Sequence, residues 1–328
     1  MTPQLPSSSV SNAMCTIVMY HYVRDVAGSR YPNIKALPTA MFERQLQHFT
    51  QHYQGLTLPQ FLECLNTNGS TAPPNPLLLT FDDGYRDHID TVAPLLNRYG
   101  LHGVFAPPVG AVKNRQPLIV NVVHAILSHT QTVTPLVAWI FEENRRLQAC
   151  QAPEALGLAS EAEYRQRYEQ ANRFDTADVI LFKRLLQHAL PPDLRWRYAT
   201  QLAEAVLPIS LTQLVDDFYM TVDDLKQLVA QGHSIAGHSH QHDWMNTQTP
   251  EQQHSELLAS QALLTEVGMS KEHHCFVPPY GAYNETTLTL MQALGFHASF
   301  TTQVGKAPLM DSQRYQLPRL DANDFLHV

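Results

Sequence analysis

Short apolar runs alternate with amphipathic stretches along most of the chain. The apolar runs have the length of β-strands and end in turn residues, and most are followed by apolar residues at helical spacing. This alternation is typical of a parallel sheet and predicts an α/β fold, a distorted (β/α) barrel. The expected strands span residues 16–20, 77–81, 104–106, 234–236, 275–277 and 298–302. The expected helices span residues 39–53, 86–99, 222–231, 250–267 and 284–294, with Thr39 and Thr221 as N-caps.

Residues 112–217 interrupt this alternation. Their apolar spacing is mostly helical, as in residues 121–127 and 178–190. We interpret the interval as a helical insertion that follows a barrel strand. It either forms a cap beside the functional site or packs only against the side of the barrel. Because residues 1–13 are polar and rich in Pro and Ser, we expect a flexible tail there and a single domain over residues 14–328.

The composition favours one enzyme-sized domain and argues against several classes of partner. With 328 residues, of which 44% are hydrophobic, the chain can bury a sizeable core. A net charge of −8 without a basic stripe argues against nucleic acid and anionic membranes as partners. The longest uncharged apolar runs are also too short to span a bilayer, so no stable membrane insertion is expected.

The cysteines and the first residues bear on the compartment. The four cysteines lie far apart in the chain and form no Cys-x-x-Cys pair, which is typical of reduced thiols. Residues 1–13 have neither the basic nor the apolar region of a signal peptide. We therefore expect a cytoplasmic protein that acts on a glycan intermediate before export.

Two adjacent carboxylates follow an apolar run, within the sequence TFDDG at residues 80–84. Gly84 permits a sharp turn, which frees Asp82 and Asp83 from the strict alternation of strand side chains. One carboxylate can then bind a metal ion while the other stays free as a general base. On its own, however, an Asp-Asp-Gly sequence is more often a simple turn.

Two histidines four residues apart follow another predicted strand, within GHSHQH at residues 237–242. On a helical turn His238 and His242 share one face, so both imidazoles reach one ion while His240 points elsewhere. With one carboxylate they supply the three ligands of a catalytic zinc-type site, which keeps a position open for water. A lone His-x-x-x-His is more often a surface or core feature. The presence of both motifs after apolar strands favours a hydrolytic metal site.

A third segment, CFVPPYG at residues 275–281, completes a resemblance to a known family. In this order the three segments resemble the motifs of the polysaccharide deacetylase (NodB-like, carbohydrate esterase) family, which are T-F-D-D-G, H-[ST]-x-x-H and aromatic-R-x-P-Y-G. The third segment departs from the family at Val277, where many members have arginine. The resemblance covers most of residues 14–324 and implies the distorted barrel of this family. The matching residues of the third motif are Phe276, Pro279, Tyr280 and Gly281.

The resemblance implies a role for each matching residue. Asp82 corresponds to the catalytic base, and Asp83, His238 and His242 correspond to the metal ligands. The main-chain N–H of Tyr280 corresponds to the donor that holds the developing oxyanion. The implied cofactor is one divalent metal ion, zinc first, with cobalt, nickel and iron as alternatives.

Two further features resemble a branch of the family that lacks the arginine at the position of Val277. One is Tyr-His at residues 20–21, after the first strand, and the other is Leu-Pro-Arg at residues 317–319. The usual C-terminal Leu-x-His, which supplies the general acid, is not evident, and His327 lies too near the terminus. In branches with a permuted motif order the acid comes from Tyr-His, so His21 is the candidate, and a structural histidine at a strand end is the alternative. Arg319 is the candidate to replace the missing arginine beside Asp82, with a structural salt bridge as the alternative.

The expected function is metal-dependent removal of an N-acetyl group from an amino sugar during synthesis of a surface glycan such as lipopolysaccharide or capsule. The expected substrate is a nucleotide-, lipid- or oligosaccharide-linked acetamido sugar; the sugar and the oligomeric state are left open. One alternative is a deformylase or O-acetyl esterase on the same fold. The other is a non-catalytic carbohydrate-binding relative, and the intact Asp82 argues against it because binding alone needs no base beside a metal.

Overall fold

A computed structural model describes residues 13–150, 156–172 and 175–328, so residues 1–12 of the predicted tail lie outside it. The chain forms two compact units. Unit 1 comprises residues 13–25, Ala36–Asn114 and Phe218–Val328, and unit 2 comprises Val26–Lys35 and Arg115–Asp217.

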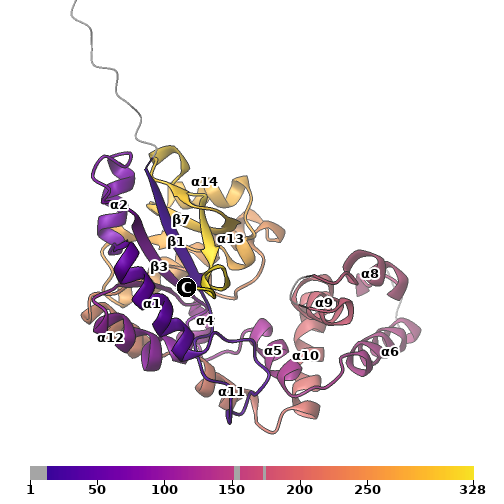
Figure 1. The fold of residues 1–328 in the computed structure, drawn as a ribbon. Helices are drawn as coiled ribbons and strands as arrows, with labels where there is room; N and C mark the ends of the chain where they lie inside the picture. The colour runs from indigo at the N-terminus through magenta and orange to yellow at the C-terminus, as the bar shows by residue number, and fades with distance from the viewer. Residues whose placement is uncertain (1–12, 151–155, 173–174) are drawn as a thin grey trace, which may run out of the picture. The chain divides into compact units, whose positions relative to one another are not determined.

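Unit 1 is built around a parallel sheet that curls into a nearly closed barrel (Figure 1). Every neighbouring pair along its main path is parallel. A parallel bridge between Gly237 and Phe276 joins the first and last strands of the path. The α/β barrel predicted from the sequence is therefore confirmed. The path runs β5 (Ser234–Ile235), β4 (Gly103–Ala106), β3 (Pro76–Asp82), β1 (Met14–Tyr20), β9 (Leu317–Asp321), β7 (Ala298–Val304) and β6 (Cys275–Phe276).

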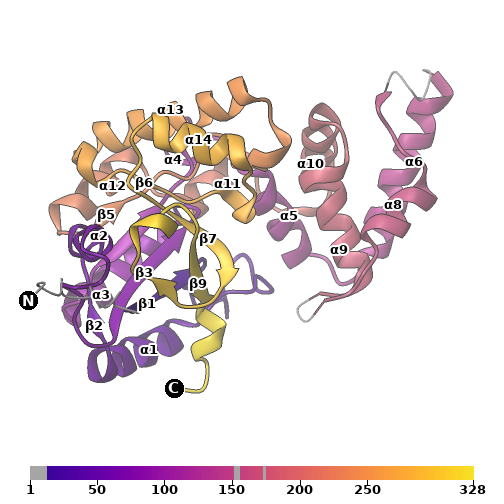
Figure 2. The ribbon, with the colours of Figure 1, turned by 90° about the horizontal axis from the view of Figure 1, so that it is seen from above.

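Two short strands pair outside this path. β2 (Gln54–Gly55) is parallel to β3, and β8 (Ala307–Pro308) is antiparallel to β1. The helices of unit 1 lie outside the strands, and Figure 2 shows α13 and α14 together on one side with α1 on the other. These helices are α1 (Thr39–His52), α2 (Leu58–Asn66), α3 (Ala93–Arg98), α4 (Val109–Val112), α12 (Val222–Ala230), α13 (Pro250–Glu266) and α14 (Glu285–Ala293).

Alternating side chains of β3 belong to two different environments. Leu77, Leu79 and Phe81 lie in the apolar cluster that includes residues of α1, α3 and α12. Leu78 belongs to a second cluster with residues of β1, β7 and α2. Because strand side chains alternate, Asp82 shares the face of Leu78 and ends the strand on the inner side.

The register of the parallel strands brings their carboxyl ends together. Tyr20 at the end of β1 pairs with Phe81, and Asp82 at the end of β3 pairs with Ala106. Phe105 in turn pairs with Ile235, two residues before Gly237. The segments that follow β1, β3 and β5 therefore begin at the same end of the barrel, which is where functional loops of such barrels lie.

Two helix starts were predicted from N-cap residues. That of α12 is correct, and that of α1 is shifted by one residue. α12 begins after the predicted N-cap Thr221, whose hydroxyl accepts a hydrogen bond from Asp224 N–H. α1 begins at Thr39 itself, because the carbonyl of Pro38 accepts the first helical bond. The helix expected at residues 86–99 contains a π-helical turn at His88–Val92. The sequence patterns gave no indication of α2 or of β9 as a strand.

Unit 2 is helical, and residues 26–35 are part of it. Asn33 Nδ2 donates to Ser128 O at 2.8 Å, and the Lys35 ammonium pairs with Asp175 at 2.7 Å. The cap function of residues 112–217 stays a prediction. No helix within the described ranges is long and apolar enough to cross a bilayer. The helices are α5 (Ile119–Ser128), α6 (Thr134–Cys150), α8 (Glu161–Tyr168), α9 (Ala177–Arg184), α10 (Pro192–Val206) and α11 (Leu211–Phe218).

Candidate metal and catalytic site

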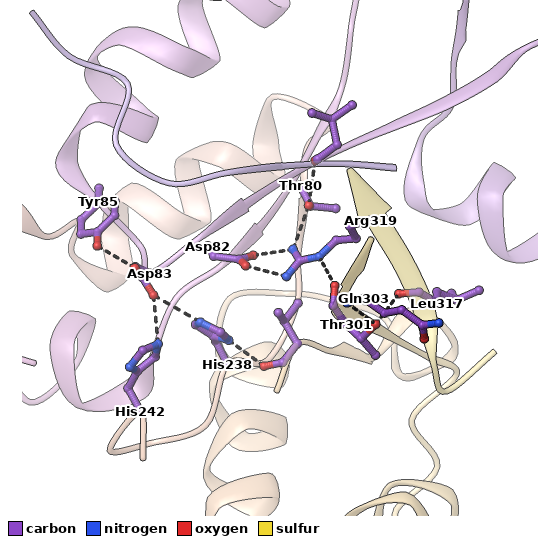
Figure 3. Close-up of polar contacts among 12 residues, drawn as sticks. Thr80, Asp82, Asp83, Tyr85, His238, His242, Thr301, Gln303, Leu317 and Arg319 are labelled. Atoms are coloured by element: carbon purple, nitrogen blue, oxygen red, sulfur yellow. Dashed lines mark hydrogen bonds and ion pairs between the residues drawn. The ribbon is translucent and has the colours of Figure 1, made fainter. Parts of the chain in front are cut away.

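Three buried side chains converge at the carboxyl ends of β3 and β5. Asp83 Oδ1 lies 3.3 Å from His238 Nε2 and 3.1 Å from His242 Nε2 (Figure 3). One donor atom from each residue lies within 4.8 Å of the others. The structure thus brings together the three residues that the sequence singled out as metal ligands.

Asp82 and Asp83 separate because the chain turns sharply at the end of β3. Asp83 has φ 72° and Gly84 has φ 68°, so two successive residues adopt the left-handed conformation. A Cβ on Gly84 would lie 2.7 Å from Pro107 Cβ, which makes glycine necessary there. The turn directs two adjacent carboxylates into different surroundings.

The histidine segment is an irregular loop, so the predicted helical turn at residues 238–242 is wrong. Ser239 and His242 both have positive φ, at 61° and 58°. The loop is held by the first turn of α4, where Val109 N–H donates to Ser239 O and Gly110 N–H donates to His240 O. These long-range hydrogen bonds replace the local ones of a helix, and the two imidazoles still converge.

Glu256 of α13 holds the same loop from the other direction. Its Oε2 accepts hydrogen bonds from the main-chain N–H groups of His240 at 2.6 Å and Gln241 at 3.0 Å. Ser239 Oγ accepts a further bond from His242 N–H at 2.9 Å. The His240 ring contacts Asn114 through Nε2, outside the group of three ligands. Sequence reasoning missed Glu256, because no motif surrounds it within its helix.

Two of the proposed ligands, His238 and Asp83, also make a hydrogen bond through the polar atom that faces away from the other ligands. His238 Nδ1 lies 2.6 Å from the carbonyl oxygen of Val277, which can only accept, so Nδ1 carries the proton and Nε2 is free to bind an ion. Tyr85 OH donates to Asp83 Oδ2 at 2.6 Å. Position 277 therefore contributes a main-chain oxygen, which any residue can supply, while its valine side chain is buried in the core.

The donor set fits a divalent metal ion. Ligand bonds of about 2.0–2.2 Å at tetrahedral angles place donor atoms about 3.3–3.6 Å apart, and the 3.3 and 3.1 Å found here lie at or just below the lower end of that range. One carboxylate and two imidazoles suit zinc and also other first-row ions. Burial alone would raise the pKa of Asp83, but the imidazoles of His242 and His238 lower it well below its usual range. A cation at this position would favour the ionised carboxylate in the same way.

Asp82 has a different partner, the guanidinium of Arg319 from β9. Arg319 Nη1 donates to Asp82 Oδ1 at 2.9 Å and Nη2 to Oδ2 at 2.7 Å, a bidentate pair. Further bonds from Arg319 to Thr80 Oγ1 and Thr301 O fix the guanidinium in the barrel interior (Figure 3). Burial raises the pKa of Asp82, but the charge and hydrogen bonds of Arg319 outweigh it, so the pKa lies below its usual value.

His21 directly follows β1, next to the β3 end that carries Asp82. Its main-chain oxygen lies 3.0 Å from His88 Nε2, and its side chain is exposed. Burial raises the pKa of Asp83, and the imidazoles of His242 and His238 lower it. The charge of His21 makes a smaller contribution in the same direction as the imidazoles. The function of His21 as the general acid stays a prediction.

Tyr280 lies in the 3₁₀ turn Pro279–Gly281 that follows β6, with φ 58° and ψ 8°. Its ring centroid is 4.8 Å from that of His242 and 5.2 Å from that of Trp244, onto which it stacks. A Cβ on Gly281 would collide with Thr302 Oγ1, so this turn also requires glycine. The third motif thus lies beside the metal ligands, and the function of the Tyr280 N–H stays a prediction.

A model of the polysaccharide deacetylase family matches residues 69–172 and 201–299. The chain belongs to the polysaccharide deacetylase family. Among curated proteins, YxkH of Bacillus subtilis (strain 168), by name a candidate polysaccharide deacetylase, is 31% identical over 102 residues. That match covers 31% of this chain and 36% of YxkH, so the chain matches only about a third of that relative's length.

Solved structures share the fold over nearly the whole chain. The deacetylase PplD of Streptococcus pyogenes, solved with acetate, has a TM-score of 0.56 at 16% identity and covers 95% of this chain and 93% of its own. IcaB from Ammonifex degensii has a TM-score of 0.53 at 15% identity and covers 94% and 91%. A de-N-acetylase from Aggregatibacter actinomycetemcomitans has a TM-score of 0.52 at 13% identity and covers 95% and 100%. The deacetylase-type barrel with a helical insertion is thus confirmed as the fold.

Proposed function

We propose that this protein is a metal-dependent deacetylase that removes the N-acetyl group from an amino sugar of a surface-glycan intermediate. The proposal rests on one observation: two adjacent carboxylates have different partners. Asp83 faces two imidazoles, whereas Asp82 is ion-paired with Arg319. One carboxylate is therefore available to a cation, and its neighbour is held ionised beside it.

In the proposed reaction, Asp83, His238 and His242 would hold a divalent ion, which polarises the amide carbonyl and makes water more acidic. Asp82 accepts a proton from the attacking water, because its lowered pKa keeps it ionised near neutral pH. The Tyr280 main-chain N–H donates to the oxyanion of the tetrahedral carbon.

The reaction is completed at the leaving nitrogen. We assign its protonation to His21, which is exposed and directly follows β1, beside the end of β3. The bond between the acyl carbon and nitrogen then breaks, and the products are acetate and a free amino sugar. Arg319 holds Asp82 in place through both carboxylate oxygens and contacts no reacting atom in this scheme.

The substrate class comes from the family and the fold. Family membership favours a carbohydrate substrate. Structural neighbours include a deacetylase solved with acetate and a de-N-acetylase, which supports an acetamido sugar. All four cysteines are free thiols, and three of them are buried, which supports action in a reducing compartment on a nucleotide-, lipid- or oligosaccharide-linked sugar.

Acyl release from a panel of N-acetylated sugars tests this proposal. The purified protein is stripped of metal with a chelator and reloaded with zinc, and acetate, formate and the free amine are measured by mass spectrometry. We expect acetate and amine only with the reloaded protein. Release of formate instead would identify a deformylase, and release of acetate from O-acetylated sugars alone would identify an esterase. Full activity of the stripped protein would refute the metal dependence.

A further inference from the structure

We infer that Tyr85 positions Asp83 for metal binding through its hydroxyl group. The inference rests on the proposed metal-dependent function, since it assigns a residue that prepares the carboxylate ligand. Tyr85 lies two residues after Asp83, and neither composition nor motif distinguishes it from an ordinary core tyrosine.

The hydroxyl makes the two oxygens of the Asp83 carboxylate unequal. Oδ2 accepts a hydrogen bond of 2.6 Å from Tyr85 OH, whereas Oδ1 faces both imidazoles (Figure 3). Bonds of this length between a hydroxyl and a charged carboxylate are strong and directional. With Oδ2 occupied, the carboxylate plane is fixed and one oxygen remains for the ion, as for hydrogen-bonded ligands of other metal sites.

The position of the hydroxyl depends on packing around the Tyr85 ring. The ring is fully buried and stacks on Tyr22, with centroids 3.9 Å apart and an interplanar angle of 18°. An antiparallel bridge links Tyr85 to Tyr219, and Met220 N–H donates to Gly84 O at 3.0 Å. The ring is therefore held by its neighbours, and the hydroxyl is directed at Asp83 before any ion arrives.

Tyr85→Phe removes the hydroxyl and keeps the ring, its stack and its volume. Asp83 Oδ2 then loses a partner, so the carboxylate can rotate or turn both oxygens toward the ion. Loss of such an outer partner typically weakens metal binding by about 10–100-fold. Asp82 is held by Arg319 through both of its oxygens, so we expect this pairing to stay intact.

Tyr20→Phe is the matched control. Tyr20 is also a buried tyrosine, and it stacks on Phe81 with centroids 5.0 Å apart. Its hydroxyl donates one bond of 2.8 Å, but to the side-chain oxygen of Gln45 rather than to a ligand. Both variants lose a buried hydroxyl group, and only Tyr85→Phe loses a hydrogen bond to a proposed ligand.

The experiment measures zinc affinity by competition with a chromophoric chelator, together with circular dichroism to confirm folding. We expect Tyr85→Phe to bind zinc about 10–100-fold more weakly than wild type and Tyr20→Phe to bind it as wild type does. With Co²⁺ in place of zinc, the visible spectrum reports the ligand geometry. It should change in Tyr85→Phe and stay unchanged in Tyr20→Phe.

The outcomes separate this inference from the proposed function beneath it. A wild-type protein that binds no zinc would refute the metal-dependent function, and the inference with it. A wild-type protein that binds zinc, beside a folded Tyr85→Phe variant with the same affinity and the same Co²⁺ spectrum, would refute the inference alone. Equal weakening in Tyr85→Phe and Tyr20→Phe would also refute it, because the effect would then be general destabilisation.

Discussion

The surroundings of Asp82 and Asp83 differ although the two residues are adjacent in the chain. Asp82 points into the barrel and is held by Arg319, which is itself bound to groups on β3 and β7. Asp83 points into the loops at the strand ends, toward His238, His242 and Tyr85. The strands thus provide a rigid partner for one carboxylate, and the loops place two imidazoles beside the other.

Asp82 and Asp83 both stay ionised, but for different reasons. Burial raises the pKa of each, and different neighbours lower it again, Arg319 for Asp82 and the imidazoles of His242 and His238 for Asp83. The guanidinium group of an arginine keeps its charge in proteins, so Asp82 remains a carboxylate without further help. A metal ion held by Asp83 and the two imidazoles would likewise favour the ionised form of Asp83. These surroundings support the proposed division, in which Asp83 binds a cation and Asp82 acts as the base.

Asp83→Ala should have the largest effect, because it removes a ligand. We expect loss of tight zinc binding and, with it, loss of measurable turnover. Metal content after dialysis, measured by elemental analysis, checks the first point. His240→Ala is the control, since this histidine lies on the same loop but outside the group of three ligands, and it should retain the metal. Metal retained by Asp83→Ala would contradict the assignment.

Asp82→Asn should reduce turnover by about 10⁴-fold, the upper end of what a general base contributes, with metal content unchanged. Steady-state kinetics and metal analysis on the same sample measure both. Asp87→Asn is the matched control, because Asp87 is also buried and paired with an arginine through both oxygens, at 2.7 Å each to Arg24. We expect it to lower the melting temperature and to leave turnover within tenfold of wild type. Equal metal loss in Asp82→Asn and Asp83→Ala would show that the two roles are not divided.

His21→Ala should slow turnover by about 10³-fold, within the usual range for a general acid, without loss of metal. The loss should be smaller for a substrate with a better leaving group, such as an aryl ester, because less protonation is needed. Rates for both substrates with each enzyme provide the test. A fully active His21→Ala enzyme would return His21 to a structural function.

Arg319→Lys should have the smallest effect. Lysine keeps the charge but cannot bind both oxygens of Asp82, and one lost hydrogen bond to a charged group costs about 1.5–3 kcal/mol. If that cost appears in the transition state, kcat falls by about 10–10²-fold with unchanged metal content. Arg24→Lys weakens the matched pair with Asp87 and should alter stability rather than kcat. The same fall in kcat for both variants would indicate that Arg319 is only a structural ion pair.

Much of the fold and of the ligand set could be predicted from the sequence, because both are expressed locally. Strand and helix alternation depends on neighbouring residues, so the barrel and most of its elements could be recognised. The turn at Gly84 and the two histidines lie within segments of a few residues, and their chemistry is evident from residue type. The predicted helical turn at residues 238–242 failed because hydrogen bonds from α4 and Glu256 determine that loop.

The sequence by itself determined that the chain forms a parallel barrel and which side chains are candidates for base and ligands. Only the tertiary structure decided their partners, because those come from distant parts of the chain. Arg319 lies 237 residues from Asp82 in sequence, and the order of β3, β1 and β9 in the sheet brings them together. The same closure of the barrel aligns the Val277 carbonyl with His238. Strand order and register are properties of the whole sheet, which is why they select contacts that no local pattern contains.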